Sequence, residues 1–340
     1  MNPMPSIFRD FKKFRFFAVA AIFMTCQPDK TLQRAQGEAL GTTYSILYAD
    51  IKANEAVLDS IDAVFLRINQ SMSTYWPNSV ISKINRGEAT QIDTDFHNVF
   101  QTAQQVWQQT DGYFDPTVGA LVNAYGFGPE KPLAVIDDKA MDSLLNITGF
   151  HRVSLFQNGT ISKENKNIYV DFNAIAKGYA VDALAKMFKS LGYENYLVEV
   201  GGELFAAGIN PVKSKPWRVA IDHPKQDKYR TFIATFSLKN QGMASSGNYR
   251  KFRTDVSGKR YVHTVNPKTG KTVQSNVLST SVLAPSTMLA DAYATALMAM
   301  PHKQGETLIE NLTDIEAMWV LAAKDSVRVV ATKGFVFERQ

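Results

Sequence analysis

One short segment of the chain holds a carboxylate, a cation and a glycine in a pattern that suits a phosphate-bearing ligand. The segment is Asp171–Asp182, and it contains Asp171, Lys177 and Gly178. Free backbone N–H groups at the start of a helix, together with a nearby cation, favour an anion. An ordinary strand–helix connection with a surface ion pair explains the same residues, so the segment alone leaves both interpretations open.

The apolar residues around this segment predict the elements that position it. Alternation over residues 168–173 predicts a strand that buries one face, with Ile168, Val170 and Phe172 inward. Helical spacing then predicts a helix that ends at Gly192 and buries Val181, Leu184, Phe188 and Leu191. Asp171 and Lys177 therefore belong to a strand-to-helix corner.

A second pair of oxygen-bearing side chains suits a hard cation. Asp291 and Thr295 are four residues apart in an otherwise apolar or small stretch, so they share one face of a buried helix. A buried carboxylate needs a cation nearby, and Mg²⁺ prefers oxygen ligands of this kind. A local salt bridge at Asp291, with the Thr hydroxyl bonded to the preceding turn, is the alternative.

A histidine offers acid–base chemistry in the third candidate group. His263 lies in an expected strand, Tyr261–Val265, and follows the hydroxyl-rich and basic segment Met243–Arg250. Histidine titrates near physiological pH and is the most frequent general base. A structural or solvated strand histidine is the competing interpretation.

Aromatic and glycine residues form two further candidate groups. The stretch Asp111–Thr117 and the following Gly126-Phe127-Gly128 could stack a planar ring, although a helix end followed by a turn also explains them. Gly201-Gly202 could admit a ligand or form a tight hairpin. The chain contains neither a Gly-x-Gly-x-x-Gly fingerprint nor a Walker loop, which argues against a Rossmann or P-loop nucleotide site.

The order of the expected elements predicts an α+β fold with mixed sheets and packed helices. Helices are expected around Val57–Ile68, between Asp93 and Gly112, and over Thr287–Met300. The remaining expected strands are Thr42–Tyr48, Tyr196–Val200, Trp217–Ile221, Thr231–Leu238, Val277–Ala284, Met318–Leu321 and Val327–Ala331. A strong turn signal lies at residues 266–270.

The N-terminus predicts export. A basic stretch precedes the apolar run Phe16–Met24, which is short for a membrane span and typical of a signal. The only cysteine, Cys26, follows directly, and we expect it to be the lipid-modified first residue of a mature lipoprotein; an incidental Cys after a cleaved signal is the alternative. The predicted layout is a signal over residues 1–25, a polar tether over 26–39 and one domain over 40–340.

Charge argues against nucleic acid as a partner. Four of the 37 Lys and Arg residues, but only one of the 32 acidic residues, lie within residues 1–25, so the remainder is close to neutral.

Taken in order, these motifs resemble the FAD:protein FMN transferase (ApbE) family, once described as thiamine-biosynthesis lipoproteins. The resemblance covers nearly all of the expected mature chain and rests on ordered motifs. These motifs are Met72-Ser73-Thr74-Tyr75, Asp111–Thr117, Gly126-Phe127-Gly128, Val170–Asp182, Gly201-Gly202-Glu203-Leu204, Trp217–Ile221, Ser246–Arg250, His263–Pro267, Thr269-Gly270 and Ala290-Asp291-Ala292. It implies a single compact unit related to the T-fold.

The resemblance also implies residue roles and an activity. The implied metal ligands for Mg²⁺ are the Ala174 carbonyl and the side chains of Asp291 and Thr295. FAD contacts are implied at Leu40, Tyr75, Tyr113, Phe114, Asp115, Asp171, Lys177 and Val265. The implied reaction transfers FMN from FAD to a Thr or Ser hydroxyl of an acceptor protein and releases AMP, with His263 the first candidate for the base and Asp291 the second.

The resemblance further implies partners and a location. The implied acceptors are exported or membrane-bound flavoprotein subunits with a flavinylation motif, such as quinone-reductase or Rnf-type subunits. A lipid anchor at Cys26 would hold the enzyme at the periplasmic face of the inner membrane. Two alternatives stay open: an FAD pyrophosphatase that gives FMN and AMP, and a non-catalytic FAD-binding lipoprotein.

Overall fold

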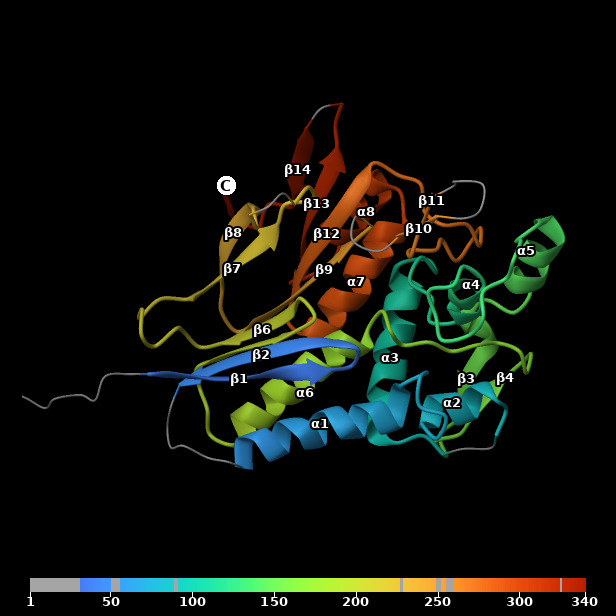
Figure 1. Ribbon diagram of the computed structural model, residues 1–340, viewed down its shortest axis with the longest axis horizontal. Coiled ribbons are helices and arrows are strands. Elements are labelled where there is room, and N and C mark those ends of the chain that lie inside the picture. The colour runs from blue at the N-terminus through green and yellow to red at the C-terminus, as the bar shows by residue number, and fades with distance from the viewer. Residues whose placement is uncertain are drawn as a thin grey trace, which may run out of the picture.

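An eight-stranded sheet lies at the centre of the computed structural model (Figure 1). The structure describes residues 31–49, 56–88, 91–226, 229–248, 252–254, 260–324 and 326–340. In spatial order the sheet comprises β1 (Leu32–Ala39), β2 (Thr42–Ala49), β5 (Tyr196–Val200), β6 (Glu203–Ala207), β9 (Gln241–Gly247), β12 (Val277–Ala284), β13 (Glu316–Ala322) and β14 (Val327–Ala331). The ladders between these strands are antiparallel.

The central sheet buries apolar side chains on both faces. Along β13, Trp319 faces one core while Met318 and Val320 face the other, as the two-residue repeat of a strand requires. The first core packs against helices, and the second packs against a three-stranded sheet of β15 (Glu338–Arg339), β8 (Phe232–Leu238) and β7 (Trp217–Asp222). Both layers are therefore held mainly by apolar burial.

Helices cover one face of the central sheet (Figure 1). Those that contribute to the first core are α1 (Ala56–Met72), α2 (Val80–Asn85), α3 (Thr94–Gln109), α6 (Ala176–Ser190), α7 (Thr287–Ala299) and α8 (His302–Glu310). Asp93 accepts a hydrogen bond from the Phe96 amide and so caps α3, which confirms the predicted start of that helix.

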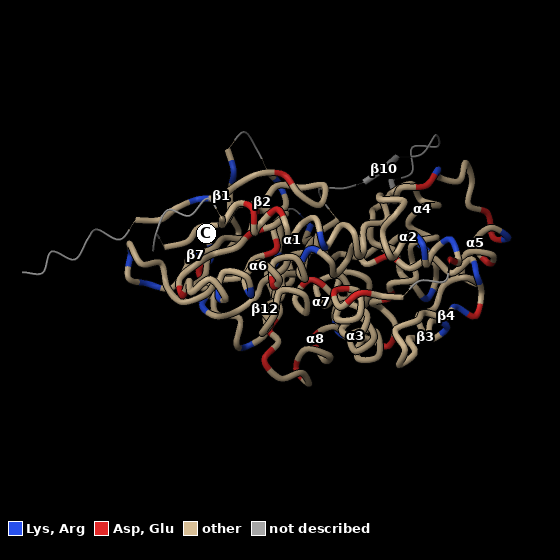
Figure 2. Tube along the Cα trace, turned by 90° about the horizontal axis from the view of Figure 1, so that it is seen from below, with Lys and Arg blue, Asp and Glu red and all other residues tan. Residues whose placement is uncertain are grey.

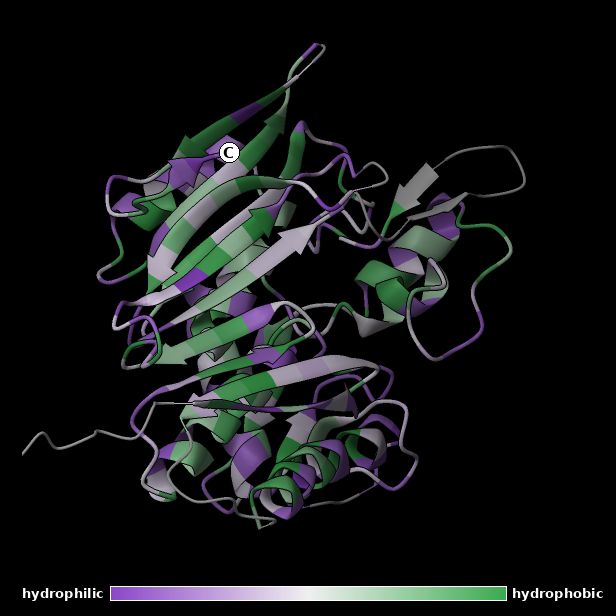
Figure 3. Ribbon diagram, turned by 60° about the vertical axis from the view of Figure 1, so that its left-hand side comes forward, coloured by the Kyte–Doolittle hydropathy of each residue, from purple (hydrophilic) through white to green (hydrophobic). Residues whose placement is uncertain are grey.

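Short elements form a lobe beside the sheet, most clearly seen in Figure 3. They include α4 (Gly119–Ala124), α5 (Asp138–Leu145) and the hairpin of β10 (Phe252–Thr254) and β11 (Arg260–Val262). The small hairpin of β3 (Val153–Leu155) and β4 (Ile161–Lys163) follows a 3₁₀ turn at Phe150–Arg152.

The α+β class and the single compact unit are confirmed, and several strands have the predicted bounds. Part of the tether prediction is wrong, because Leu32–Ala39 is strand β1, paired along its length with β2. Polar residues suit β1 because it is an edge strand whose outer side faces solvent. Cys26 and the signal lie outside the described residues.

Two further predictions need correction. Residues 168–173 bury Ile168, Val170 and Phe172 as expected, but they form no strand ladder and only an isolated bridge at Tyr169. Leu191 is 44% exposed rather than buried, since α6 ends at Ser190 and Leu191 is its C-cap.

Charged residues of both signs are interspersed along the described chain (Figure 2). Within that part of the chain, each helix is too short or too polar to cross a bilayer.

Candidate active site

The first turns of α6 and α7 lie against each other and exchange caps. Asp182 of α6 accepts hydrogen bonds from the amides of Thr287 and Met288, at 2.8 and 2.9 Å. Asp291 of α7 accepts one from the amide of Gly178, at 3.0 Å. Carboxylates at helix N-termini satisfy free amides and the positive end of the helix dipole. The two helices therefore cross antiparallel at the predicted corner.

Gly178 permits this close crossing. A Cβ at this position would lie 2.4 Å from the Thr287 carbonyl oxygen and 2.8 Å from Met288 Cα, which are backbone atoms that cannot move aside easily. The glycine of the predicted corner thus serves helix packing.

Three ionisable side chains, Lys177, Glu203 and Asp291, form what we call the charged cluster. Lys177 Nζ lies 3.3 Å from Glu203 Oε1 and 3.7 Å from Asp291 Oδ2. Both carboxylates are 3% exposed. Burial opposes the charge of Lys177, but the two carboxylates outweigh it and raise its pKa. Burial raises the pKa of Glu203 to about 7, against the effect of Lys177.

The three sequence-predicted metal ligands offer oxygen atoms of the kinds that a hard divalent cation accepts. Both contacts at Asp291 go to Oδ2, so neither engages Oδ1. Thr295 lies one turn further along α7, and its hydroxyl lies 3.4 Å from that of Ser246. Ala174 lies in the turn just before α6. Carboxylate, hydroxyl and carbonyl oxygens are the donors that Mg²⁺ accepts.

A site built only from His, Cys, Asp and Glu is not available here. No three such side chains in the described part of the chain are grouped to hold a metal ion. A cation site at α7 would therefore depend on the Thr hydroxyl and on the backbone.

The corner before α6 is held by loops and side chains instead of a neighbouring strand. The Asn85 amide pairs with both the N–H and the C=O of Val170, at 2.8 Å each. The Asp171 N–H donates to the Pro116 carbonyl at 2.7 Å. Lys163 Nζ donates to the carbonyls of Asn85 and Ile168. These bonds satisfy the backbone as a ladder would, which explains the strand-like burial without a strand.

Asp171, Tyr75 and Tyr169 share one electrostatic environment at this corner. Burial raises the pKa of Asp171, while hydrogen bonds from Asn173 oppose the rise. Burial and the nearby Asp171 carboxylate raise the pKa of Tyr75, and they raise that of Tyr169 to about 12. Tyr75 is 61% exposed, so its ring is open to a ligand.

The segment after α3 carries the ring of Tyr113, which is partly buried and packs against the first core. Lys268 Nζ lies 4.4 Å from the centre of the Tyr113 ring and 2.5 Å from Asp111 Oδ2. Lys268 belongs to the predicted turn at residues 266–270, where the Gly270 amide donates to the Asn266 carbonyl. Phe114, by contrast, is buried in the first core.

Asp115 is engaged in a local network. One carboxylate oxygen accepts the N–H and O–H of Thr117, and the other accepts the Phe150 N–H at 3.0 Å. Burial raises the pKa of Asp115. These hydrogen bonds and one from Trp107 oppose the rise but do not cancel it. The Asp115 side chain therefore holds the loop that carries Tyr113 in place. A ligand at this loop would contact other groups of the loop and not the Asp115 carboxylate.

His263 lies outside a strand, contrary to prediction. The structure ends β11 at Val262 and places His263 in the bend that follows. Its ring centre lies 6.3 Å from that of Phe127, in an edge-on contact, so two predicted motifs meet here. The neighbouring Thr264 hydroxyl donates to Asn248, and Val265 is buried in a bridge with Thr272.

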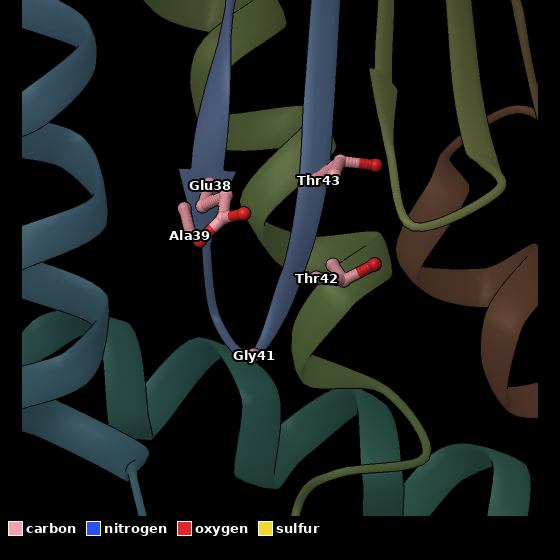
Figure 4. A pocket seen from close by; sticks show the side chains of 5 residues that line it. All are labelled: Glu38, Ala39, Gly41, Thr42 and Thr43. Carbon is pink, nitrogen blue, oxygen red and sulfur yellow. The ribbon is translucent and has the colours of Figure 1, made fainter.

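A pocket of about 500 Å³ lies at the tip of the β1–β2 hairpin, beside Leu40 (Figure 4). Its lining residues are Glu38, Ala39, Gly41, Thr42 and Thr43. Leu40 has a φ of +52°, which the tight hairpin imposes. A Cβ on Gly201 would lie 2.8 Å from Thr42 Cγ2 and 3.4 Å from Glu203 Oε2. Gly201 therefore lies close both to Thr42, which lines the pocket, and to Glu203 of the charged cluster.

The structure gives roles to two residues that the sequence did not single out. Asp182 caps α7, and Glu203 joins the charged cluster from the start of β6. Gly201-Gly202 forms the hairpin between β5 and β6, with φ of +64° and +107°, and thereby brings Glu203 into place. An acidic residue at the start of an apolar strand was the available signal.

Comparison with known protein families and curated proteins points to one family. The model of the ApbE family matches residues 40–319. A FAD:protein FMN transferase of Haemophilus influenzae is 36% identical over 83% of this chain and 85% of its own length. One of Vibrio cholerae is 33% identical over 94% of this chain and 96% of its own length.

Solved structures show the same similarity in three dimensions. The flavin transferase ApbE from Vibrio cholerae has a TM-score of 0.81 and 33% identity, and the match covers 90% of this chain and 98% of that one. The apo form of the flavinyl transferase ApbE from Pseudomonas stutzeri has a TM-score of 0.79 and 29% identity, covering 90% and 96%.

Proposed function

This chain belongs to the ApbE family, and we propose that it transfers the FMN moiety of FAD to a Thr or Ser hydroxyl of an acceptor flavoprotein, releasing AMP. The charged cluster at the α6–α7 crossing is the observation that carries this proposal. It places a partly exposed ammonium and two buried carboxylates beside the corner that holds Asp171. One ammonium does not offset two carboxylates, so this site would hold a pyrophosphate group only together with a divalent cation at Asp291.

The reaction is a phosphoryl-type transfer from FAD to the acceptor. The acceptor oxygen forms a bond to the FMN-side phosphorus, and the bond from that phosphorus to the AMP phosphate oxygen breaks. The hydroxyl proton passes to a base, and AMP departs with the electron pair of the broken bond. The products are an FMN phosphoester on the acceptor and free AMP.

This chain's residues contribute charge, position and stacking. Lys177 presents its ammonium to the pyrophosphate, and the Asp171 corner positions it. The exposed ring of Tyr75 is available to stack on the flavin or adenine, whereas the partly buried ring of Tyr113 already has the Lys268 ammonium over one face. Phe114, Asp115 and Val265 are buried, and Leu40 lies between Ala39 and Gly41, which line the hairpin-tip pocket.

We further propose that Asp291, Thr295 and the Ala174 carbonyl hold Mg²⁺. When bound, the ion supplies neutralisation of the pyrophosphate charge and favours the AMP leaving group. The oxygen donors at α7, with Asp291 Oδ1 outside the contacts to Gly178 and Lys177, support this assignment.

His263 is the proposed base for the acceptor hydroxyl. It lies in the bend after β11, against Phe127. An imidazole can take a proton near neutral pH, which a neutral hydroxyl nucleophile requires. Asp291 is the second candidate.

Export and lipid anchoring at Cys26 are proposed from the sequence. An anchor would keep the enzyme on the same periplasmic membrane surface as exported acceptors, such as quinone-reductase or Rnf-type subunits. Membrane fractionation of the full chain tests this. We expect Cys26→Ser to leave the membrane fraction or to keep its signal uncleaved, and identical processing and partition would indicate an ordinary cleaved signal.

The proposed function is tested by incubating the enzyme with FAD, Mg²⁺ and a candidate acceptor, then weighing the acceptor by mass spectrometry. We expect the acceptor to gain one FMN with loss of water, in step with AMP release. An acceptor whose Thr is replaced by Val serves as the matched control. AMP release without any acceptor gain would instead identify an FAD pyrophosphatase, and FAD binding without turnover would identify a carrier.

A further inference from the structure

Glu203 is buried at the charged cluster with one carboxylate oxygen left unsatisfied. Its Oε1 lies 3.3 Å from Lys177 Nζ, and its Oε2 has no hydrogen-bond partner among the residues that the structure describes. A Cβ added at Gly201 would lie 3.4 Å from this Oε2, so the backbone of the β5–β6 hairpin passes close to it. Burying such a carboxylate is costly, so Lys177 is its principal compensation.

Lys177 is shared between two carboxylates, and the sharing is uneven. Its Nζ is nearer to Glu203 than to Asp291, at 3.3 against 3.7 Å. Asp291 is the proposed ligand of the divalent cation, and a lysine ammonium bound tightly to it would compete with that cation. Lys177 contacts Asp291 Oδ2 and leaves Oδ1 outside the contact, but an ammonium held closer to Oδ2 would neutralise the carboxylate and weaken its attraction for a cation at Oδ1.

We propose that Glu203 is a positioning residue that holds Lys177 away from Asp291. Contact between Glu203 and the ammonium keeps the lysine from closing onto Asp291, so Asp291 stays available to the cation. This inference rests on the proposed metal site at Asp291 and Thr295. It assigns Glu203 a role that acts through Lys177 and does not require Glu203 to touch FAD.

The direct test measures metal binding without FAD or acceptor, using Mn²⁺ as a paramagnetic probe detected by EPR. We expect Glu203→Gln to bind Mn²⁺ about tenfold more weakly, because supporting residues around metal ligands typically influence affinity by about 10–100-fold. The variant keeps the shape of the side chain but loses the charge that attracts Lys177.

A matched variant separates contact from charge. Glu203→Asp keeps the charge but is shorter by one methylene, so it cannot reach Lys177 from the same backbone position. We expect this variant to bind Mn²⁺ as weakly as Glu203→Gln. The double variant Lys177→Met, Glu203→Gln removes the competing ammonium, and we expect it to bind at least as tightly as the wild type.

Each outcome is decisive. Wild-type Mn²⁺ affinity in Glu203→Gln overturns the inference, and so does wild-type affinity in Glu203→Asp, which would mean that charge acts without contact. If Glu203→Gln does not fold, the double variant decides, and weaker binding than wild type overturns the inference. Asp291→Ala distinguishes the premise, since unchanged Mn²⁺ binding there would overturn the metal site itself.

Discussion

Two carboxylates on neighbouring helices perform the same local task with different consequences. Asp182 uses both of its oxygens on the first amides of α7, where Ser286 also caps the helix. Asp291 uses only Oδ2, on the amide of Gly178 and the ammonium of Lys177. Asp182 is therefore saturated by the fold, while Asp291 keeps an oxygen that a ligand can use.

This difference indicates how one helix crossing combines stability with function. The α7 end has two caps and completes the fold. The α6 end takes its cap from a residue of the charged cluster, since Ile175 provides none from its side chain. We expect loss of Asp182 to reduce stability and loss of Asp291 to reduce activity.

The largest expected effect is on catalysis in Asp291→Ala. We expect FMN transfer to fall by about 10³-fold or more, because the proposed cation loses its carboxylate ligand. The free energy of unfolding should change by less than about 2 kcal/mol. Loss of the hydrogen bond to the Gly178 amide destabilises the fold, while removal of a buried charge offsets part of that loss. Single-turnover transfer at limiting Mg²⁺ and urea denaturation measure the two effects. A wild-type rate of transfer in this variant would show that Asp291 is not needed for activity.

The next effect is expected in His263→Ala, which leaves both helix caps intact. Transfer should slow by about 10²–10⁴-fold while FAD affinity stays near the wild-type value, because a base acts on the acceptor hydroxyl and not on the flavin. Flavin fluorescence titration beside single-turnover rates checks this. Loss of FAD binding would instead make His263 a ligand contact, and Asp291 would become the leading candidate for the base.

A smaller effect, on stability alone, is expected in Asp182→Ala. The amides of Thr287 and Met288 would lose their shared acceptor in a buried position, which costs about 2 kcal/mol. Chemical denaturation measures this loss, and transfer by the folded fraction should stay within about threefold of wild type. A loss of transfer as large as that of Asp291→Ala would show that the two carboxylates are not distinct.

The smallest expected effect is a pH dependence of the contribution that Asp182 makes to the free energy of unfolding. Burial raises the pKa of Asp182 to about 6 in the folded protein, above the ordinary value of 3.8. The folded state therefore binds a proton at Asp182 more readily than the unfolded state does. As a result, the contribution of Asp182 to stability becomes more favourable as pH falls from above 6 toward 3.8. Between pH 8 and pH 5 the wild type should gain about 1.4 kcal/mol relative to Asp182→Asn. Parallel denaturation curves for the two proteins would contradict the assignment.

Much of the fold followed from the sequence because local patterns report burial directly. The strands Tyr196–Val200, Val277–Ala284 and Val327–Ala331 were predicted with their observed bounds. Residues 168–173 were predicted as a strand because their burial alternates, yet their hydrogen-bond partners are Asn85 and Pro116, which are distant in the sequence. A periodic pattern specifies which side chains are buried and does not specify what pairs with the backbone.

The sequence by itself determined the family, the α+β class and the pairing of Asp291 with Thr295 on one helix face, since these depend on motifs and spacing. Only the tertiary structure decided that Lys177 lies between Glu203 and Asp291 and that Asp182 caps α7. These contacts join residues from different elements, far apart along the chain. Their distances depend on how closely α6, α7 and the β5–β6 hairpin pack, and that packing is set by glycines such as Gly178 and Gly201 whose neighbours no local pattern reveals.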